Sequence, residues 1–359
     1  MIDITDRALL YVYHGAKSEK RGRRKAMAYK MTKERFNQYI QDWQQDYIIY
    51  APAIFPGKGS FTDTDSVRYK QITTLEEITF AKKSDYSAKE VVLPITQTLF
   101  YFTEENWSVP KISDKKILIF ARSCDIHAIK RLDDIYLGNG AEDPYYKAFR
   151  EKVRFALIEC HTSFANCFCV SMGTNVAPDY DLFVRHDEQA VYVGVNNPEF
   201  TFPEEEVVEV TLQFVQENAT KVTIPENFDL AAVTQAPLWQ EYSARCLGCG
   251  RCSFVCPTCS CFSMQDIFYK DNANAGERRR VWASCMVDGF TDMAGGHGFR
   301  KSKGDRMRFR VMHKIGDYKK RFGYHMCVGC GRCDDICPEY ISFTGCINKL
   351  AHITEEVKA

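Results

Sequence analysis

The apolar residues of the central part of the chain are grouped as strands and helices would require. Short apolar runs at residues 117–120 and 155–158 suit buried strands, and residues 191–195 alternate weakly, which is typical of another strand. Between the first two runs, apolar residues at helical spacing predict a helix over residues 125–137. The pattern therefore predicts an N-terminal domain of the α+β or α/β class.

The N-terminal end lacks this pattern. Residues 14–30 carry seven Lys or Arg, which indicates a solvated tail. We therefore expect residues 1–30 to form a basic, mobile extension. Met27 or Met31 could be the natural start, because Thr32 is a plausible N-cap for the helix that follows.

The character of the chain changes again near Pro237. Beyond it, glycines are frequent, strand-like runs are scarce, and twelve of the sixteen cysteines lie between residues 246 and 346. We expect a first domain at residues 31–236 and a second, mainly helical domain at residues 237–359.

Composition excludes several classes of protein. The 359 residues include 47 Lys or Arg and 47 Asp or Glu, so binding of nucleic acid through bulk charge is not expected. No stretch approaches the roughly 18 apolar residues of a membrane span, and the first residues do not resemble a secretory signal. We expect a cytoplasmic protein with no membrane partner, in which clustered thiols serve metal or redox chemistry.

Two cysteine runs carry the strongest signal. Residues 246–257 and 327–338 both read C-x2-C-x2-C-x3-C-P and are identical at eight of twelve positions. Thiolates at this spacing wrap one corner of an iron–sulfur cube, and the glycines between them let backbone N–H groups approach the sulfurs. Structural zinc in two four-thiolate sites is the alternative.

In two-cluster ferredoxins the fourth cysteine of each run binds the other cluster. Two 4Fe-4S clusters are therefore expected here, each held by three cysteines of one run and one cysteine of the other. The first set is Cys246, Cys249, Cys252 and Cys337, and the second set is Cys256, Cys327, Cys330 and Cys333.

The long segment between the runs favours a helical ferredoxin type. Four further thiols lie within or just after it and serve either as packing around the clusters or as part of another metal site. They are Cys259, Cys261, Cys285 and Cys346.

A third site is suggested before Pro237. Cys124 follows a strand and opens a helix, whose N-terminus would lower the pKa of its thiol and favour an anionic cluster. Cys160 also follows a strand, and Cys167 and Cys169 come shortly after it. These four could hold a third cluster, with Asp125 as an alternative ligand, or some could be ordinary buried thiols.

Fingerprints of other chemistry are missing from the sequence. It has no dinucleotide-binding glycine motif, no P-loop, no H-E-x-x-H and no G-x-S-x-G. His297 and the basic run at residues 277–280 are interpreted as a loop near a cluster or a docking face. No catalytic residue is therefore assigned, and no substrate site is expected on this chain.

Several stretches resemble the A subunits of anaerobic sulfite reductases, the iron–sulfur electron-transfer subunits of three-subunit complexes. More distantly, the chain is similar to the β subunits of cytoplasmic sulfhydrogenases. Besides the two cysteine runs, the matching stretches are residues 50–52, 61–65, 94–102, 119–125, 166–175, 278–286 and 291–300.

The resemblance implies a place in an electron route. A flavin subunit would take electrons from NAD(P)H, this subunit would relay them singly through its clusters, and a sirohaem subunit would reduce sulfite to sulfide. The relatives also imply a cluster in the α/β domain. The main alternative is the equivalent subunit of a soluble hydrogenase, and a standalone ferredoxin-like carrier or redox sensor is a third.

Overall fold

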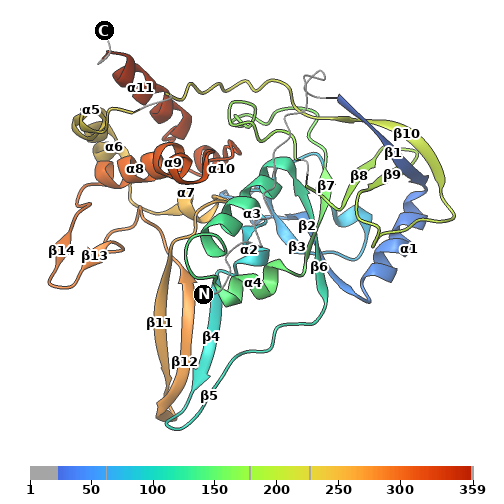
Figure 1. The fold of residues 1–359 in the computed structure, drawn as a ribbon, viewed down its shortest axis with the longest axis horizontal. Coiled ribbons are helices and arrows are strands. Elements are labelled where there is room, and N and C mark those ends of the chain that lie inside the picture. Colours follow the sequence, from blue (N-terminus) through green and yellow to red (C-terminus); the bar gives the residue numbers. More distant parts are fainter. Residues whose placement is uncertain (1–22, 62, 178, 226–227, 357–359) are drawn as a thin grey trace, which may run out of the picture.

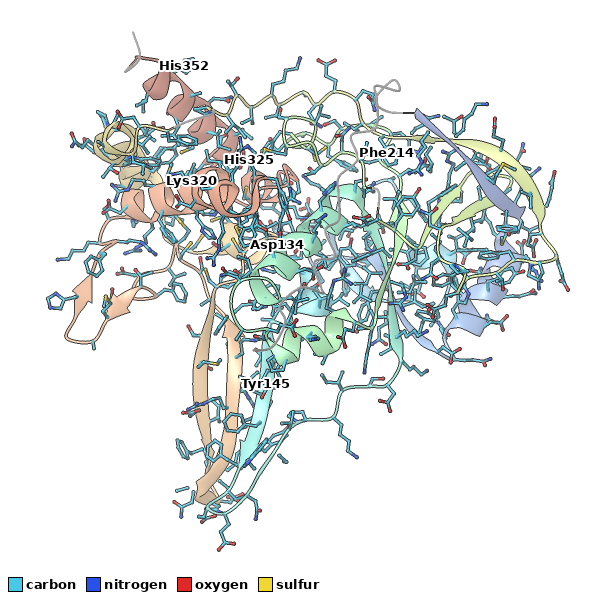
Figure 2. All side chains as sticks on the ribbon, viewed as in Figure 1. Asp134, Tyr145, Phe214, Lys320, His325 and His352 are labelled. Atoms are coloured by element: carbon cyan, nitrogen blue, oxygen red, sulfur yellow. The ribbon has the colours of Figure 1, made fainter. Side chains whose placement is uncertain are left out.

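The computed structural model of the chain describes residues 23–61, 63–177, 179–225 and 228–356. Figure 1 shows a large sheet with helices on its faces, a group of C-terminal helices beside it, and a narrower sheet that projects from the junction; Figure 2 adds the side chains. None of the helices in the described ranges has both the length and the apolar character needed to span a membrane.

The large sheet has eight strands in the order β10-β1-β9-β8-β7-β6-β2-β3. The central strands β2, β6, β7 and β8 are parallel to one another, and the other neighbours are antiparallel. The three strands predicted from apolar runs are confirmed as β6, β7 and β9. In chain order the strands are β1 (Arg23–Met31), β2 (Tyr47–Phe55), β3 (Ser66–Gln71), β6 (Lys116–Arg122), β7 (Val153–Ile158), β8 (Leu182–His186), β9 (Val191–Val195) and β10 (Glu206–Gln213).

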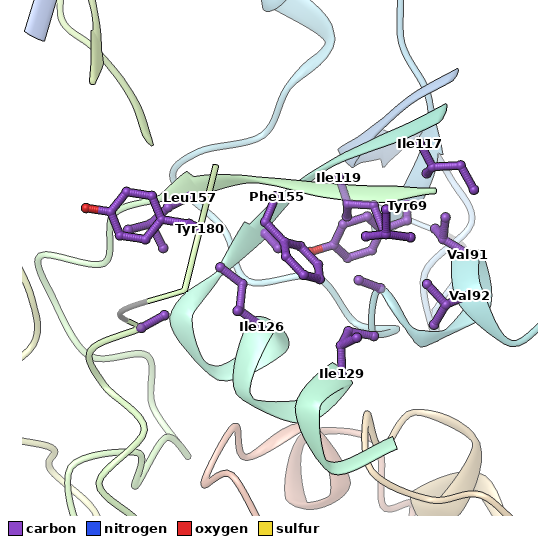
Figure 3. Packing of buried hydrophobic residues seen from close by; sticks show 14 of the residues in the cluster. Tyr69, Val91, Val92, Ile117, Ile119, Ile126, Ile129, Phe155, Leu157 and Tyr180 are labelled. Atoms are coloured by element: carbon purple, nitrogen blue, oxygen red, sulfur yellow. The ribbon is translucent and has the colours of Figure 1, made fainter. Parts of the chain in front are cut away.

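Helices cover both faces of this sheet because the side chains of the central strands alternate between two apolar cores. Leu118 and Phe120 belong to the core under α1, whereas Ile119 belongs to the core under α3. Figure 3 shows Ile126 and Ile129 of α3 directed at the sheet. The predicted helix is thus confirmed as α3. The helices of this region are α1 (Lys33–Trp43), α2 (Lys89–Val92), α3 (Ser123–Tyr136) and α4 (Pro144–Arg150), with a 3-10 turn at Leu75–Glu77.

The expectation of a mobile extension through residue 30 is wrong for residues 23–30. They form most of β1, which pairs with β10 on one side and β9 on the other. Their basic side chains do not oppose this, because Lys25 forms an ion pair with Glu209 on β10. The remainder of the expected extension lies outside the described residues. Thr32 is confirmed as the N-cap of α1, since its hydroxyl accepts a hydrogen bond from the Arg35 backbone N at 3.2 Å.

The expectation of a mainly helical C-terminal region is not confirmed, because a substantial sheet accompanies its helices. Its long hairpin of β11 and β12 joins two strands from the N-terminal part in a sheet of order β11-β12-β4-β5. Much of this hairpin is exposed, so its sequence lacks the buried apolar run by which a strand is recognised. These strands are β4 (Thr96–Phe102), β5 (Trp107–Ser108), β11 (Phe262–Tyr269) and β12 (Asn272–Trp282), and a small hairpin follows with β13 (Asp292–Met293) and β14 (His297–Gly298).

The C-terminal helices pack around a third apolar core that includes Trp239, Val311 and Leu350. Pro237 lies between two of them, where the sequence suggested a boundary. The helices are α5 (Leu230–Gln235), α6 (Leu238–Arg245), α7 (Arg251–Phe254), α8 (Lys303–Met312), a π-helical turn (His313–Asp317), α9 (Tyr318–Phe322), α10 (Arg332–Asp335) and α11 (Phe343–Glu356).

Candidate metal centres

The two cysteine runs fold alike. Gly250 and Gly331 have φ of 74° and 72°, and each stands directly before a short helix, α7 or α10. The backbone N of Gly248 lies 3.3 Å from Cys246 Sγ, and that of Gly329 lies 3.5 Å from Cys327 Sγ. The predicted approach of backbone donors to the sulfurs is therefore confirmed, and such hydrogen bonds favour the thiolate form.

The first set of cysteines lines one hollow. Cys337 comes from the second run, yet it reaches the same hollow as the three cysteines of the first run. Apolar side chains such as Met286 and Phe343 line the rest of it, together with Arg310. The fold thus brings together the four thiols predicted for the first cluster.

The second set is also gathered across the two runs. Burial raises the pKa of the Cys327 thiol to about 12, and Cys256 and Cys330 add to this electrostatically. Burial likewise raises the pKa of Cys333, with Asp334, Cys256 and Cys330 acting in the same direction. Cys256 of the first run is therefore close enough to interact electrostatically with all three cysteines of the second.

The third site is a hollow of its own, the third hollow, which contains all four cysteines of the N-terminal region. Cys124 and Cys160 lie just beyond the carboxyl ends of β6 and β7, which are adjacent parallel strands. The loop after β7 adds Cys167 and Cys169. The four thiols line one pocket, so the predicted convergence at this edge of the sheet is confirmed.

Two details of this third site differ from expectation. Asp125 does not line the pocket, because its carboxylate is engaged by Arg332 at 2.7 and 2.9 Å. It is therefore unsuited to the role of alternative ligand. The pKa of the Cys124 thiol is raised by burial and by the adjacent Asp125, rather than lowered as the sequence suggested.

The second and third sites touch each other. The sulfur of Cys167 donates to the Cys330 backbone oxygen at 3.4 Å, and the backbone N of Phe168 donates to Gly329 O at 2.8 Å. Lys83 lies at the same junction, where its ammonium donates to Cys330 O at 2.8 Å and lies 3.7 Å from Cys167 Sγ. Cys330 itself lines the third hollow, and Cys333 lines the first.

The four remaining thiols are placed beside the first two sites. Cys259 donates a hydrogen bond to Cys256, which lowers the pKa of Cys256 against the opposing effect of burial. Cys285 similarly donates to Cys261, and Cys346 is buried next to Tyr242. In the described part of the chain, no group of three or more His, Cys, Asp or Glu side chains is arranged to hold a metal ion. Cluster thiolates need not converge in that way, because each binds a different iron of the cube.

Sequence reasoning missed the basic side chains around these thiols, since no local motif marks them. Lys83, Arg122, Lys314 and Arg310 lie beside the three thiol sites. Their charge suits sites for anionic iron–thiolate clusters. His297, by contrast, is exposed on β14 and lines neither of the two hollows.

Comparison with known proteins agrees with this arrangement. A family model described as a 4Fe-4S dicluster domain matches residues 245–341, which contain both cysteine runs. The chain is 30% identical over 307 residues to sulfhydrogenase 2 subunit beta of Pyrococcus furiosus, an alignment that covers 79% of this chain and 88% of that protein. No solved structure matches the chain significantly.

Proposed function

Because this chain belongs to the family of the sulfhydrogenase β subunits, we propose that it is the electron-transfer subunit of a hydrogenase-type complex. The homology and the dicluster domain support an iron–sulfur electron-transfer subunit that works with other chains. The sulfite reductase assignment, which the sequence favoured, receives no such support. It becomes the second candidate.

Three ligand sets would hold 4Fe-4S clusters, each of which stores and passes single electrons when bound. The protein supplies thiolates from two chain segments to each ferredoxin-type site, so neither forms until the two runs meet. The third set depends on β6 and β7 being neighbours. The first set is Cys246, Cys249, Cys252 and Cys337; the second is Cys256, Cys327, Cys330 and Cys333; the third is Cys124, Cys160, Cys167 and Cys169.

The order of the three sets is the observation that carries this proposal. Two cysteines of the second set reach the neighbouring sites: Cys330 lines the third hollow, and Cys333 lines the first hollow. The second set therefore lies between the other two, and together they form a continuous line of sites. A line of this kind is what a relay of single electrons between two partner subunits requires.

The outer end of the line is at the first set. Cys249 is exposed, whereas Cys256 and Cys330 of the second set are buried. Two side chains near the first set are also exposed, Leu247 by 59% and Tyr340 by 83%. We propose that one redox partner, a flavin subunit that oxidises NAD(P)H or the terminal reductase, contacts the protein here.

Among the stretches that resemble the sulfite reductase subunits, residues 94–102 and 291–300 favour that alternative over the hydrogenase subunit. They lie on β4 and around the β13–β14 hairpin. Neither stretch contains a proposed cluster ligand, so the cysteine sites serve both candidates equally. The two functions differ in the partner that accepts electrons.

Anaerobic purification of the native complex tests the proposal. Iron and sulfide should be present at about four atoms of each per site. Nickel in a copurifying subunit supports the hydrogenase assignment, and sirohaem supports sulfite reductase. A colourless protein that holds only zinc contradicts both.

A further inference from the structure

Lys314 and Arg310 are buried cations of the C-terminal region that have no carboxylate partner among the described residues. They are 2% and 3% exposed. Two other buried arginines are paired with carboxylates: Arg332 with Asp125, and Arg280 with Asp143. Because an isolated buried charge is strongly destabilising, Lys314 and Arg310 require another source of negative charge.

Thiolates provide that charge. The Lys314 ammonium interacts electrostatically with Cys256 and Cys259, and it lies 2.8 Å from Thr258 Oγ1 in the same segment. Arg310 interacts in the same way with Cys252 of the first set and Cys333 of the second. Arg310 therefore lies between two ligand sets, whereas Lys314 is directed at Cys256.

A hydrogen-bond chain connects Lys314 to Cys256. Its ammonium donates to Thr258 Oγ1 at 2.8 Å, and Thr258 Oγ1 lies 3.5 Å from Cys256 Sγ. An ammonium can only donate, and a metal-bound thiolate has no proton to give. The Thr258 hydroxyl must therefore accept from Lys314 and donate to the sulfur of Cys256.

The backbone of Lys314 is tied to the same ligand set. Lys314 lies in the π-helical turn between α8 and α9, and its carbonyl oxygen accepts from the backbone N of Met326 at 2.9 Å and of Cys327 at 3.4 Å. π-Helical turns are uncommon and recur at functional sites. Lys314 thus contacts the start of the second run through its backbone, and its side chain is connected to Cys256 through Thr258.

We propose that Lys314, acting through Thr258, raises the reduction potential of the cluster held by Cys256, Cys327, Cys330 and Cys333. This inference rests on the proposed function, which places a cluster there. Reduction adds a negative charge, and a fixed cation together with a hydrogen bond to a ligand sulfur stabilises the reduced form. Lys314 is a positioning residue in this account, since it touches no ligand sulfur itself.

The test is an EPR-monitored redox titration of the anaerobically purified full chain. In Lys314→Met we expect the ratio of reduced to oxidised second cluster at a fixed potential to fall at least tenfold, which is about 59 mV for one electron. Lys314→Arg should retain most of the wild-type potential. Lys320→Met, which removes an exposed lysine on α9, is the matched control and should change nothing (Figure 2).

Each result bears on a separate claim. If the Lys314→Met protein retains its iron and its reduction potentials are unchanged, the inference is overturned and the proposed function stands. If the wild-type protein contains no iron and sulfide, the proposed function itself is overturned. If Lys314→Met fails to retain iron, Thr258→Val replaces it, because it removes the hydroxyl with little change of shape. Thr258→Val should shift the potential in the same direction by a smaller amount, and the absence of a shift overturns the inference.

Discussion

The guanidinium of Arg332 donates to both carboxylate oxygens of Asp125, at 2.7 and 2.9 Å, and neither side chain is more than 1% exposed. Asp125 lies in the first turn of α3 beside Cys124, and Arg332 begins α10 in the second cysteine run. The pair therefore fixes the second and third ligand sets relative to each other. The equivalent arginine of the first run, Arg251, is exposed.

Removal of one member of this pair should be strongly destabilising. Arg332→Gln leaves the carboxylate of Asp125 buried without its cation, which we expect to lower the free energy of unfolding by about 3–5 kcal/mol. Arg251→Gln changes the corresponding residue of the first run and should cost less than about 0.5 kcal/mol. Anaerobic urea unfolding measures both values. Equal losses in the two variants contradict the role given to the pair.

The exchange of cysteines between the two runs predicts which cluster each variant loses. Cys337→Ser should mainly damage the site of Cys246, because Cys337 lines that hollow. Cys256→Ser should mainly damage the site of Cys327, whose thiol it neighbours. Iron counting and EPR of the reduced proteins distinguish the two losses, and the opposite pattern means that each run binds its own cluster.

The third ligand set makes a quantitative prediction. Cys167→Ala combined with Cys169→Ala removes two of the four thiols that line the third hollow, so about four irons should be lost per chain. Cys346→Ala is a suitable control, because this buried thiol belongs to no ligand set. An unchanged iron content in the double variant would show that no cluster is held there.

The contact between the second and third sites requires glycine at position 329. Its φ is 64°, and a Cβ there would lie 2.6 Å from the carbonyl oxygen of Phe168. Gly323 has a similar φ of 83° but open space around it. Gly323→Ala therefore measures the cost of a positive φ for alanine without any steric clash, about 1–2 kcal/mol. We expect Gly329→Ala to be more destabilising than Gly323→Ala by about 1–3 kcal/mol in thermal unfolding. Equal effects mean that Phe168 moves aside freely.

The free energy of unfolding should decrease at acidic pH, in part because His127 becomes protonated. Burial lowers its pKa to about 4, although its Nε2 donates to Val176 O at 2.7 Å. In the unfolded state the imidazole titrates near 6.5, so the unfolded state binds the proton more tightly than the folded state does. The contribution of neutral His127 to the free energy of unfolding is therefore lost as the pH falls from about 6.5 towards 4. The loss is at most about 1.4 kcal/mol per pH unit.

His127→Gln should therefore flatten the dependence of unfolding free energy on pH in this window. His313, whose pKa burial also lowers to about 4, and His325, whose pKa burial lowers as well, contribute to the slope that remains. Urea unfolding at several pH values measures the slope, with His297→Gln at an exposed position as the control. The same slope in His127→Gln as in the wild type contradicts the assignment.

The central strands, α3 and its N-terminal cysteine could be read from the chain because their signals are local. Apolar periodicity marks β6, β7 and α3, and the position of Cys124 and Cys160 after adjacent strands indicates one shared edge. The hairpin of β11 and β12 was missed because exposed strands bury too little apolar surface to leave a pattern. The strand β1 was missed because its lysines are neutralised by glutamates of a strand distant in sequence.

The chemistry of the cysteine runs follows from residue type and short spacing, which determine how a few residues of backbone can wrap thiolates. The order of the three sites, the Arg332–Asp125 pair and the path from Lys314 to Cys256 depend instead on segments far apart in the chain. Such contacts arise from packing and from the need to neutralise buried charge. Neither can be evaluated until the fold places those segments side by side.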